Sequence, residues 1–460
     1  MSLPRLLCIV ATFLAFSGFL APDAGSARLA PSPPWQKPAV LPTLSQKRLL
    51  NDLQVITASA PHLGDSMTIG LVTRYGSIYD PAEKGGLAQL VSRMFMSASQ
   101  DRSAKDLQDD MNYLGASIEV RGDWDGVRFI LRGHSSRFER SLLLLYQVVG
   151  EVLFTEEAFA RVKREIIQEM EQPEDPRQRI RSRFETSLFH GTSYGRPLRG
   201  TKASLEKISL GDVRLFYRRY FSPHSSTLAI VSSAPVEQVQ QKATRIWGVW
   251  VRSEEVPFTF LPPRGPSSKM VTLEDDPASP AAQFVLGNLW PRREDPAFMA
   301  AVLAARSLQE RLTRALPTSL VTVGFEGRRM PGPFYIQGQA AADQAVSEVK
   351  KVIEIVEEFK TAGISPEELA AVQKSWIDEF HKTFESSETL CNLILDTELY
   401  RLGSNYSSNF AEAVQRNNPD RVKQAAKEWL FPGGVLIFVR GPAVTLRPGL
   451  ELLGPVRPAS

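Results

Sequence analysis

Histidine and cysteine, the residues that most often bind metals or act as nucleophiles, are scarce in this chain of 460 residues. Two histidines share one metal from a single helix when they lie four residues apart, because they then face the same way. None of the five histidines has such a neighbour: His62, His134, His190, His224 and His381. We therefore expect solvated histidines in loops or at strand ends, and not metal ligands.

Other chemistry also lacks support in the sequence. Cys8 and Cys391 are the only cysteines, and Cys391 lies in the apolar stretch 390–395, which favours a buried structural thiol over a reactive one. There is no G-x-S-x-G motif and no phosphate-binding glycine loop. The net charge of +3 is spread over the chain in short basic runs, which indicates solvated faces and no nucleic-acid partner.

The stretch from Arg74 to Ala98 organises the sequence around it. Asp80-Pro81 and Gly85-Gly86 punctuate a loop. Apolar residues then recur at helical spacing: Leu87, Leu90, Val91, Met94 and Phe95. The pattern predicts a strand end, a loop and an amphipathic helix that carries Gln89, Ser92 and Arg93 beside its apolar stripe.

This stretch resembles the pitrilysin/insulinase family of zinc peptidases, whose helix carries an inverted H-x-x-E-H motif. In that motif two histidines share one zinc, and the glutamate beside the second histidine activates the bound water. At the three positions this chain has Gln89, Ser92 and Arg93. The resemblance implies the frame of the family without its catalytic glutamate and without its two metal-binding histidines, so no bound zinc is expected in this chain.

Matches further along the chain extend the resemblance to roughly residues 45–445. The family's third zinc ligand is a glutamate about 75 residues on, and Glu169 follows Arg93 by 76 residues in a similar context, Ile166-Ile-Gln-Glu-Met170. Other matches follow in order: Leu114-Gly-Ala116, Tyr194-Gly-Arg-Pro-Leu-Arg-Gly200 and Tyr220-Phe-Ser-Pro223.

The resemblance also implies where substrate would lie. On the strand that pairs with substrate the family has an asparagine and small residues, where this chain has Glu119, Val120, Arg121 and Gly122. In the second half of active members, an arginine followed seven residues later by a tyrosine holds the substrate backbone and the oxyanion. Arg314 occupies the arginine position and Val321 the tyrosine position, and valine cannot donate a hydrogen bond to an oxyanion. We therefore expect substrate contacts at Glu119, Val120, Arg121 and Arg314, without a complete catalytic set.

The chain divides into segments by composition and repetition. We predict a signal peptide over 1–27, a proline-rich arm over 28–45, domains over 46–252 and 269–445, a proline-rich linker over 253–268 and a loose tail over 446–460. The signal peptide implies export, and the family setting implies a periplasm, with no stable membrane span after cleavage.

The second domain repeats features of the first at offsets near 205–210. Phe334-Tyr-Ile-Gln-Gly338 echoes Phe129-Ile-Leu-Arg-Gly133, and 365–379 echoes 155–169. The repetition predicts two homologous α+β domains, each with helices packed on a mainly antiparallel sheet.

Three functions remain open at this stage. The first is a catalytically inactive, non-catalytic subunit of a heterodimeric processing peptidase, in which a motif-bearing partner of the same family holds the zinc and the two share a chamber for peptide. The second is a structural or peptide-binding protein similar to the core subunits of respiratory complexes. The third is an active metallopeptidase with an unrecognised metal site.

The substitutions themselves predict a contact. Without zinc, Glu169 would be a carboxylate that lacks its cation, and Arg93 offers a planar donor fork opposite it. We expect an ion pair between Arg93 and Glu169, with Gln89 close enough to hydrogen-bond either partner. The alternative is that Arg93 extends into solvent.

Overall fold

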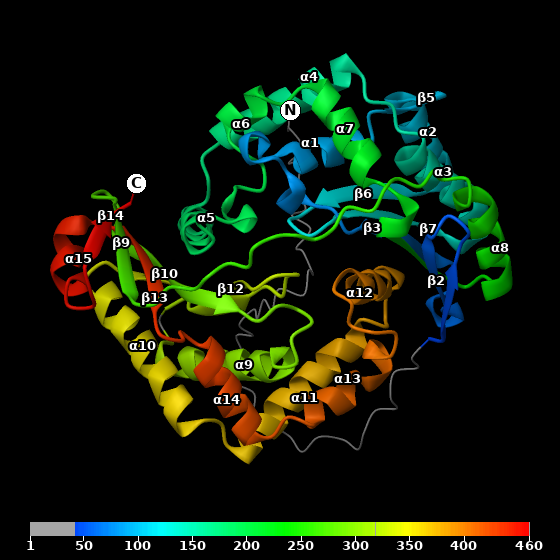
Figure 1. Cartoon of the computed structure of the whole chain (residues 1–460). Coiled ribbons are helices and arrows are strands. Elements are labelled where there is room, and N and C mark those ends of the chain that lie inside the picture. The colour runs from blue at the N-terminus through cyan, green and yellow to red at the C-terminus, as the bar shows by residue number, and fades with distance from the viewer. Residues whose placement is uncertain (1–41, 318, 460) are drawn as a thin grey trace, which may run out of the picture.

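Two six-stranded sheets, each covered by helices, make up the computed structural model of the chain, which describes residues 42–317 and 319–459 (Figure 1). The first sheet has the strand order β1-β2-β8-β3-β7-β6, and the second has the order β11-β12-β10-β13-β9-β14. In both sheets only one internal pair is parallel, β2 with β8 and β9 with β13, together with the edge pair β14 with β9 in the second. The expected α+β class with mainly antiparallel sheets is confirmed.

The first half runs from β1 to α8. Its strands are β1 (Leu44–Arg48), β2 (Gln54–Ser59), β3 (Ser66–Thr73), β6 (Ser117–Gly122), β7 (Val127–His134) and β8 (Ser226–Ser232), with a small ribbon of β4 (Ala98–Ser99) and β5 (Arg102–Ser103). Its helices are α1 (Leu87–Met94), α2 (Ala104–Leu114), α3 (Phe138–Gly150), α4 (Glu156–Glu171), α5 (Pro176–Leu188), α6 (Lys202–Glu206), α7 (Leu210–Tyr220) and α8 (Val236–Trp247).

The second half runs from β9 to β14. Its strands are β9 (Lys269–Asp275), β10 (Ala281–Trp290), β11 (Thr322–Phe325), β12 (Gly332–Ala341), β13 (Val435–Gly441) and β14 (Val456–Pro458). Its helices are α9 (Phe298–Ala315), α10 (Ala345–Ala362), α11 (Pro366–Lys382), α12 (Ser387–Leu399), α13 (Tyr406–Gln415), α14 (Pro419–Trp429) and α15 (Ala443–Leu450).

The two halves share one topology. The order β2-β8-β3-β7-β6 in the first sheet corresponds to β9-β13-β10-β12-β11 in the second, with the same parallel and antiparallel pairings. In each half a helix follows the central strand, α1 after β3 and α9 after β10. The duplication predicted from sequence echoes is therefore present in the fold.

Each half gives one helix to the sheet of the other half. Helix α5 packs on β10 and β13, and α12 packs on β3 and β8 (Figure 1). Both helices cross a glycine of the central strand, since a Cβ on Gly287 would lie 2.3 Å from Phe184 Cζ and a Cβ on Gly70 would lie 2.6 Å from Cys391 Sγ. The exchange joins the two halves through apolar contacts that neither half can make alone.

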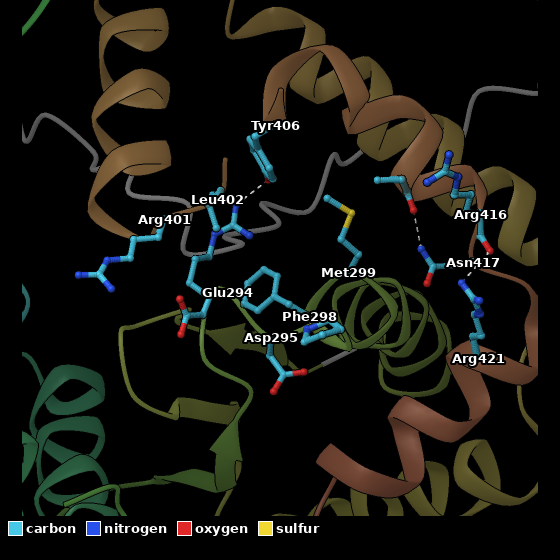
Figure 2. Close-up of a pocket in the computed structure, with 13 residues that line it drawn as sticks. Glu294, Asp295, Phe298, Met299, Arg401, Leu402, Tyr406, Arg416, Asn417 and Arg421 are labelled. Atoms are coloured by element: carbon cyan, nitrogen blue, oxygen red, sulfur yellow. Dashed lines mark hydrogen bonds between the residues drawn. The ribbon is translucent and has the colours of Figure 1, made fainter. Parts of the chain in front are cut away.

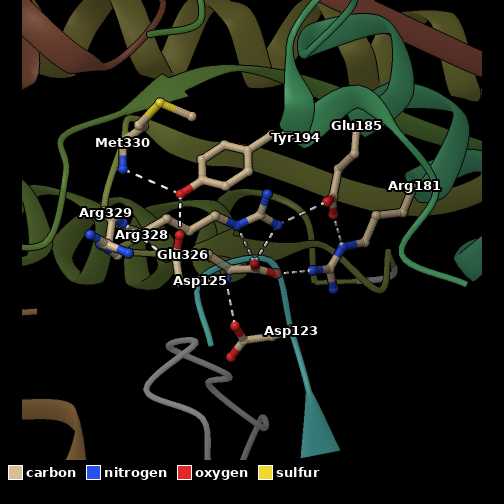
Figure 3. Close-up of polar contacts among 9 residues, drawn as sticks. All are labelled: Asp123, Asp125, Arg181, Glu185, Tyr194, Glu326, Arg328, Arg329 and Met330. Atoms are coloured by element: carbon tan, nitrogen blue, oxygen red, sulfur yellow. Dashed lines mark hydrogen bonds and ion pairs between the residues drawn. The ribbon is translucent and has the colours of Figure 1, made fainter. Parts of the chain in front are cut away.

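A buried ionic cluster also joins the halves (Figure 3). Arg328 of the second half, 4% exposed, pairs with Glu326 at 2.6 Å and with Glu185 of α5 at 3.2 Å. Beside it the Tyr194 hydroxyl donates to Asp125, and the backbone N–H of Arg329 donates to the same carboxylate at 2.9 Å. Arg328 is buried and its two carboxylate partners are partly buried, so separation of the halves would remove Glu185 from Arg328.

Residues 49–53 form a turn before β2, in which Asp52 adopts a positive φ of 69° and the Asn51 amide donates to Trp247 O at 2.8 Å. One sequence expectation about local structure was wrong. The tail expected to be loose over 446–460 contains the end of α15 and strand β14. Leu446 and Leu450 are fully buried, and β14 pairs with β9, which explains its order. The signal peptide and most of the proline-rich arm lie outside the described residues.

Candidate functional site

Helix α1 presents the residues that match the zinc motif, and its amino end is fixed by a buried carboxylate. Asp80 accepts hydrogen bonds from the backbone N–H groups of Gly86 at 2.8 Å and Ala88 at 2.9 Å, where free helix donors need partners. Gly86 has a φ of 93°, and a Cβ there would lie 2.5 Å from Arg199 O. The loop 194–200 thus packs directly against the start of α1.

Arg93 and Glu169 form the predicted ion pair. Arg93 Nη1 donates to Glu169 Oε1 at 2.6 Å, and Arg93 Nη2 donates to Glu169 Oε2 at 2.8 Å, so both carboxylate oxygens are engaged. Hydrogen bonds from Arg93 lower the pKa of Glu169, and Arg199, with Nη1 3.8 Å from Glu169 Oε2, adds to this. The exposed fractions of the two side chains are 29% and 43%, so the pair lies at a half-open surface and not in the interior.

Gln89 does not join this pair, contrary to expectation. Its amide donates to Gly122 O at 2.5 Å, while Ser92 Oγ donates to Ala88 O at 2.7 Å within the helix. A Cβ on Gly122 would lie 2.6 Å from Ser92 Oγ and 3.2 Å from Gln89 Nε2. The end of β6 therefore lies against α1, and the polar groups of Gln89 and Ser92 are used in packing.

Strand β6 carries the residues expected to meet substrate, and it is the outermost described strand of the first sheet. Glu119 forms ion pairs with Arg121 and with Arg132 of β7, the latter at 3.0 Å. Arg132 in turn pairs with Glu388 of α12. The charged face of β6 is thus tied to the exchanged helix, and Val120 is half-buried.

The second half places Arg314 in the last turn of α9. Its side chain is exposed, and Nε donates to Glu310 O at 3.3 Å. Val321 is buried, with 6% exposure. No described contact joins Arg314 to Arg93, Glu169 or β6, so its assignment to substrate stays a prediction.

The residues at the metal position of the family do not fit zinc. The Arg93 guanidinium bonds both oxygens of Glu169, the carboxylate at the position of the family's third zinc ligand. The Gln89 amide and the Ser92 hydroxyl, which stand in place of a histidine and a glutamate, each donate to a backbone oxygen. Within residues 42–317 and 319–459, no group of three or more histidine, cysteine, aspartate or glutamate side chains is arranged to hold a metal. Gln89, Ser92, Arg93 and Glu169 therefore do not offer the ligand set of the family's zinc site.

Sequence comparisons identify the family of the chain. The sequence model described as insulinase (peptidase family M16) matches residues 55–202, and the one described as peptidase M16 inactive domain matches residues 207–375. The chain belongs to the M16 (insulinase) peptidase family. Its resemblance to the pitrilysin/insulinase zinc peptidases is thereby confirmed.

The curated M16 relatives are distant. An uncharacterized zinc protease of Rickettsia felis is 23% identical over 216 residues, which are 47% of this chain and 52% of the relative. The chain thus spans about half the length of the first curated relatives that it matches, 52% in each case. Zinc protease PqqE of Helicobacter pylori is 18% identical over 77% of this chain and 83% of its own.

Solved M16 structures share the fold. A peptidase M16 inactive domain from Pseudomonas fluorescens superposes with a TM-score of 0.79 at 20% identity, covering 88% of this chain and 99% of its own. The periplasmic protease PqqL of Escherichia coli gives a TM-score of 0.73 at 15% identity, covering 91% of this chain and 49% of its own. No helix in the described part of this chain is long and apolar enough to cross a membrane.

Proposed function

We propose that this M16 protein is an exported, non-catalytic subunit that works with a motif-bearing peptidase of its own family. The observation that carries the proposal is the two-pronged contact of Arg93 with Glu169 inside a retained M16 frame. The pair uses the geometry that would otherwise hold a metal, and it needs no other ligand. Zinc is expected only in the partner subunit.

The retained frame supports a role in shaping a peptide chamber. The chain superposes on solved M16 structures over most of its length, although Gln89, Ser92 and Arg93 stand at the positions of the zinc motif. Such a chain can still present a surface to a partner and to peptide. In this proposal Arg314 and the charged face of β6 meet the peptide.

Co-expression with a family member that has an intact H-x-x-E-H motif tests the proposal. We expect a complex that co-purifies and cleaves an unfolded peptide faster than the motif-bearing protein alone. Equal activity of the motif-bearing protein by itself would refute the partner role. The matched control is this chain with Arg314→Glu, which should still assemble but should change the peptide preference of the complex.

Restoring the zinc motif tests whether the backbone of this chain can still position metal-binding side chains. The triple variant Gln89→His, Ser92→Glu, Arg93→His supplies the missing groups on α1 opposite Glu169. We expect the variant to bind about one zinc per chain, because its two histidines and Glu169 would supply three ligands for one metal. We expect the parent chain to bind no stoichiometric zinc. Zinc bound by the parent chain would favour the third function, a peptidase with an unrecognised metal site.

A peptide-binding protein without a partner is the second candidate, and the open edge of β6 favours it. An outermost strand can accept an extended peptide as a further strand. Binding of an unfolded peptide by this chain alone, with no gain on adding a motif-bearing relative, would support this candidate over the first.

A further inference from the structure

A groove of about 330 Å³ lies at the amino end of α9, between the loop before that helix and the segments that follow α12 and α13 (Figure 2). The apolar part of its lining, called the floor below, includes Phe298, Met299, Leu402 and Ala413. Four arginines and two carboxylates also line it: Arg293, Arg401, Arg416, Arg421, Glu294 and Asp295. The groove belongs to the second half and contains none of the residues that match the zinc motif of the family.

Three of the arginines have no carboxylate partner among the described residues. Arg293 donates to the Tyr406 hydroxyl at 2.6 Å and lies 4.5 Å from the centre of the Phe298 ring. The only hydrogen bond described for the Arg421 side chain goes to Arg416 O at 3.5 Å, and none is described for the side chain of Arg401. Each of these guanidinium groups therefore keeps donors available for an anion.

The two carboxylates of the groove bond to groups other than these three arginines. Asp295 accepts a hydrogen bond from the backbone N–H of Ala297 at 2.8 Å, and Glu294 lies 3.2 Å from Arg292. The fourth arginine, Arg416, pairs with Glu412 on its own helix. Burial lowers the pKa of the Arg74 guanidinium, and the nearby positive charge of Arg401 lowers it further. The four lining arginines outnumber the two lining carboxylates, so the lining carries a net positive charge.

The loop before the corresponding helix of the first half has a different neighbour. There the segment after α5 bonds directly to the loop before α1: Arg196 donates to Asp80 O at 2.6 Å, and Ser204 Oγ donates to Gly85 O at 2.8 Å. In the second half, the segment after α12 and the loop before α9 line the groove together.

We propose that this groove binds an acidic, partly apolar segment of a polypeptide in extended form. In the close-up, Arg401 lies on one side and Arg416 and Arg421 lie on the other, with Phe298 and Met299 between them (Figure 2). Carboxylates of the segment pair with the arginines at the two sides, and an apolar side chain between them covers the floor. A small inorganic anion would leave that floor exposed to water. The proposal does not depend on the partner role proposed above.

Fluorescence anisotropy of the full chain with a labelled peptide tests the assignment. The probe is a ten-residue peptide that alternates glutamate with leucine and phenylalanine, and its comparison peptide has glutamine in place of every glutamate. We expect the glutamate peptide to bind at least about tenfold more tightly, with the difference shrinking as salt screens the charges. Equal binding of the two peptides would overturn the proposal.

Charge-reversal variants locate the site. Arg401→Asp with Arg421→Glu should weaken the glutamate peptide at least about tenfold, since each removes a charge-assisted contact and adds repulsion. Aspartate is chosen at 401 because that residue has a φ of 54°, which aspartate tolerates better than glutamate. Both residues are exposed, so the fold should persist, and an unchanged melting temperature checks this.

A matched variant controls for net charge. Arg164→Glu with Arg264→Glu makes the same change in charge at two exposed arginines outside the groove. This control should bind the glutamate peptide like the parent chain. Equal weakening in both double variants would show non-specific attraction, and complete displacement of the peptide by a few millimolar inorganic phosphate would show a simple anion site. Either result would refute the proposal.

Discussion

At the scale of single residues, Arg93 and Glu169 form an ion pair at two positions that match the zinc ligands of the family. The arrangement uses a planar guanidinium on α1 and a carboxylate on α4, with two hydrogen bonds of 2.6 and 2.8 Å. The ion pair links the two helices at a half-open surface. It cannot activate water, because both oxygens are engaged by a permanent cation.

Replacement of Arg93 should be mild for stability. We expect Arg93→Ala to lower the free energy of unfolding by less than about 1 kcal/mol, because the pair is 29% and 43% exposed and water screens it. Urea denaturation of Arg93→Ala, Glu169→Gln and the double variant measures the coupling. A loss of several kcal/mol would show that the site is enclosed when the protein is in solution.

The sequence predicted this contact but not its surroundings. Spacing in the chain and the chemistry of substitution indicated that Arg93 and Glu169 face each other. The approach of Gly122 to Ser92, which draws Gln89 away to the carbonyl of β6, depends on how a strand end meets a helix. A single sequence carries no information on that distance.

At the scale of elements, the amino end of α1 depends on a carboxylate that is 5% exposed. Burial raises the pKa of Asp80 to about 7, and hydrogen bonds from Ala88 and Gly86 act in the opposite direction. In the unfolded chain an aspartate titrates near about 3.9. Between these values the folded state holds a proton that the unfolded state has lost.

Asp80 should therefore make stability fall as pH rises. Its contribution to the free energy of unfolding is fully present below about pH 4 and is lost progressively up to about pH 7. Asp80→Asn should flatten this dependence, since asparagine keeps one acceptor for α1 and does not titrate. Chemical denaturation at pH 4.5, 6 and 7.5 provides the comparison, and equal slopes for the parent and the variant would contradict the assignment.

The exchanged helices depend on two glycines of the central strands. A Cβ on Gly287 would lie 2.2 Å from the backbone oxygen Phe334 O, whereas the atoms nearest to a Cβ on Gly70 belong to the side chains of Cys391 and Leu395. Backbone cannot move aside as easily as the end of a side chain. The two positions are equivalent in the fold but differ in tolerance.

Alanine at the two glycines should separate these cases. We expect Gly287→Ala to destabilise the protein by about 3 kcal/mol or more and Gly70→Ala by about 1–2 kcal/mol. The control is Gly211→Ala in α7, where the nearest atom lies 3.5 Å away and alanine should be neutral or slightly stabilising. Thermal melts rank the three variants, and a reversed order of the first two would refute the argument.

At the scale of the whole molecule, the sequence indicated two similar halves but not how they are joined. Repeated strand and helix patterns at a constant offset predict duplication. The apolar stripe of a helix, however, does not determine which sheet it packs against. By its sequence pattern alone, Phe184 on α5 could pack against either sheet. In the structure Phe184 packs against Phe438 of the second sheet, with ring centres 6.2 Å apart.

Only part of the linker between the halves packs against the rest of the protein. Its first part is fixed, because Tyr75 Oη donates to Val256 O at 3.0 Å and the ring of Phe260 lies 4.8 Å from that of Tyr79. Leu261 is 84% exposed. A specific protease site inserted after Leu261 can therefore be cut without disturbing the packed regions.

Cutting the linker should leave the protein assembled. The exchanged helices bury Phe184 and Leu395 fully in the opposite half, and Arg328 keeps its partners in α5 and in its own loop, so neither fragment can leave without exposing apolar surface and unpaired charge. We expect the two fragments to elute together in gel filtration at the volume of the uncut chain and to separate only in denaturant. The control is the same cut in Gly287→Ala, where α5 no longer fits its sheet and the fragments should part at lower denaturant concentration. Separation of the parent fragments in buffer alone would mean that the covalent linker, and not the helix exchange, holds the halves together.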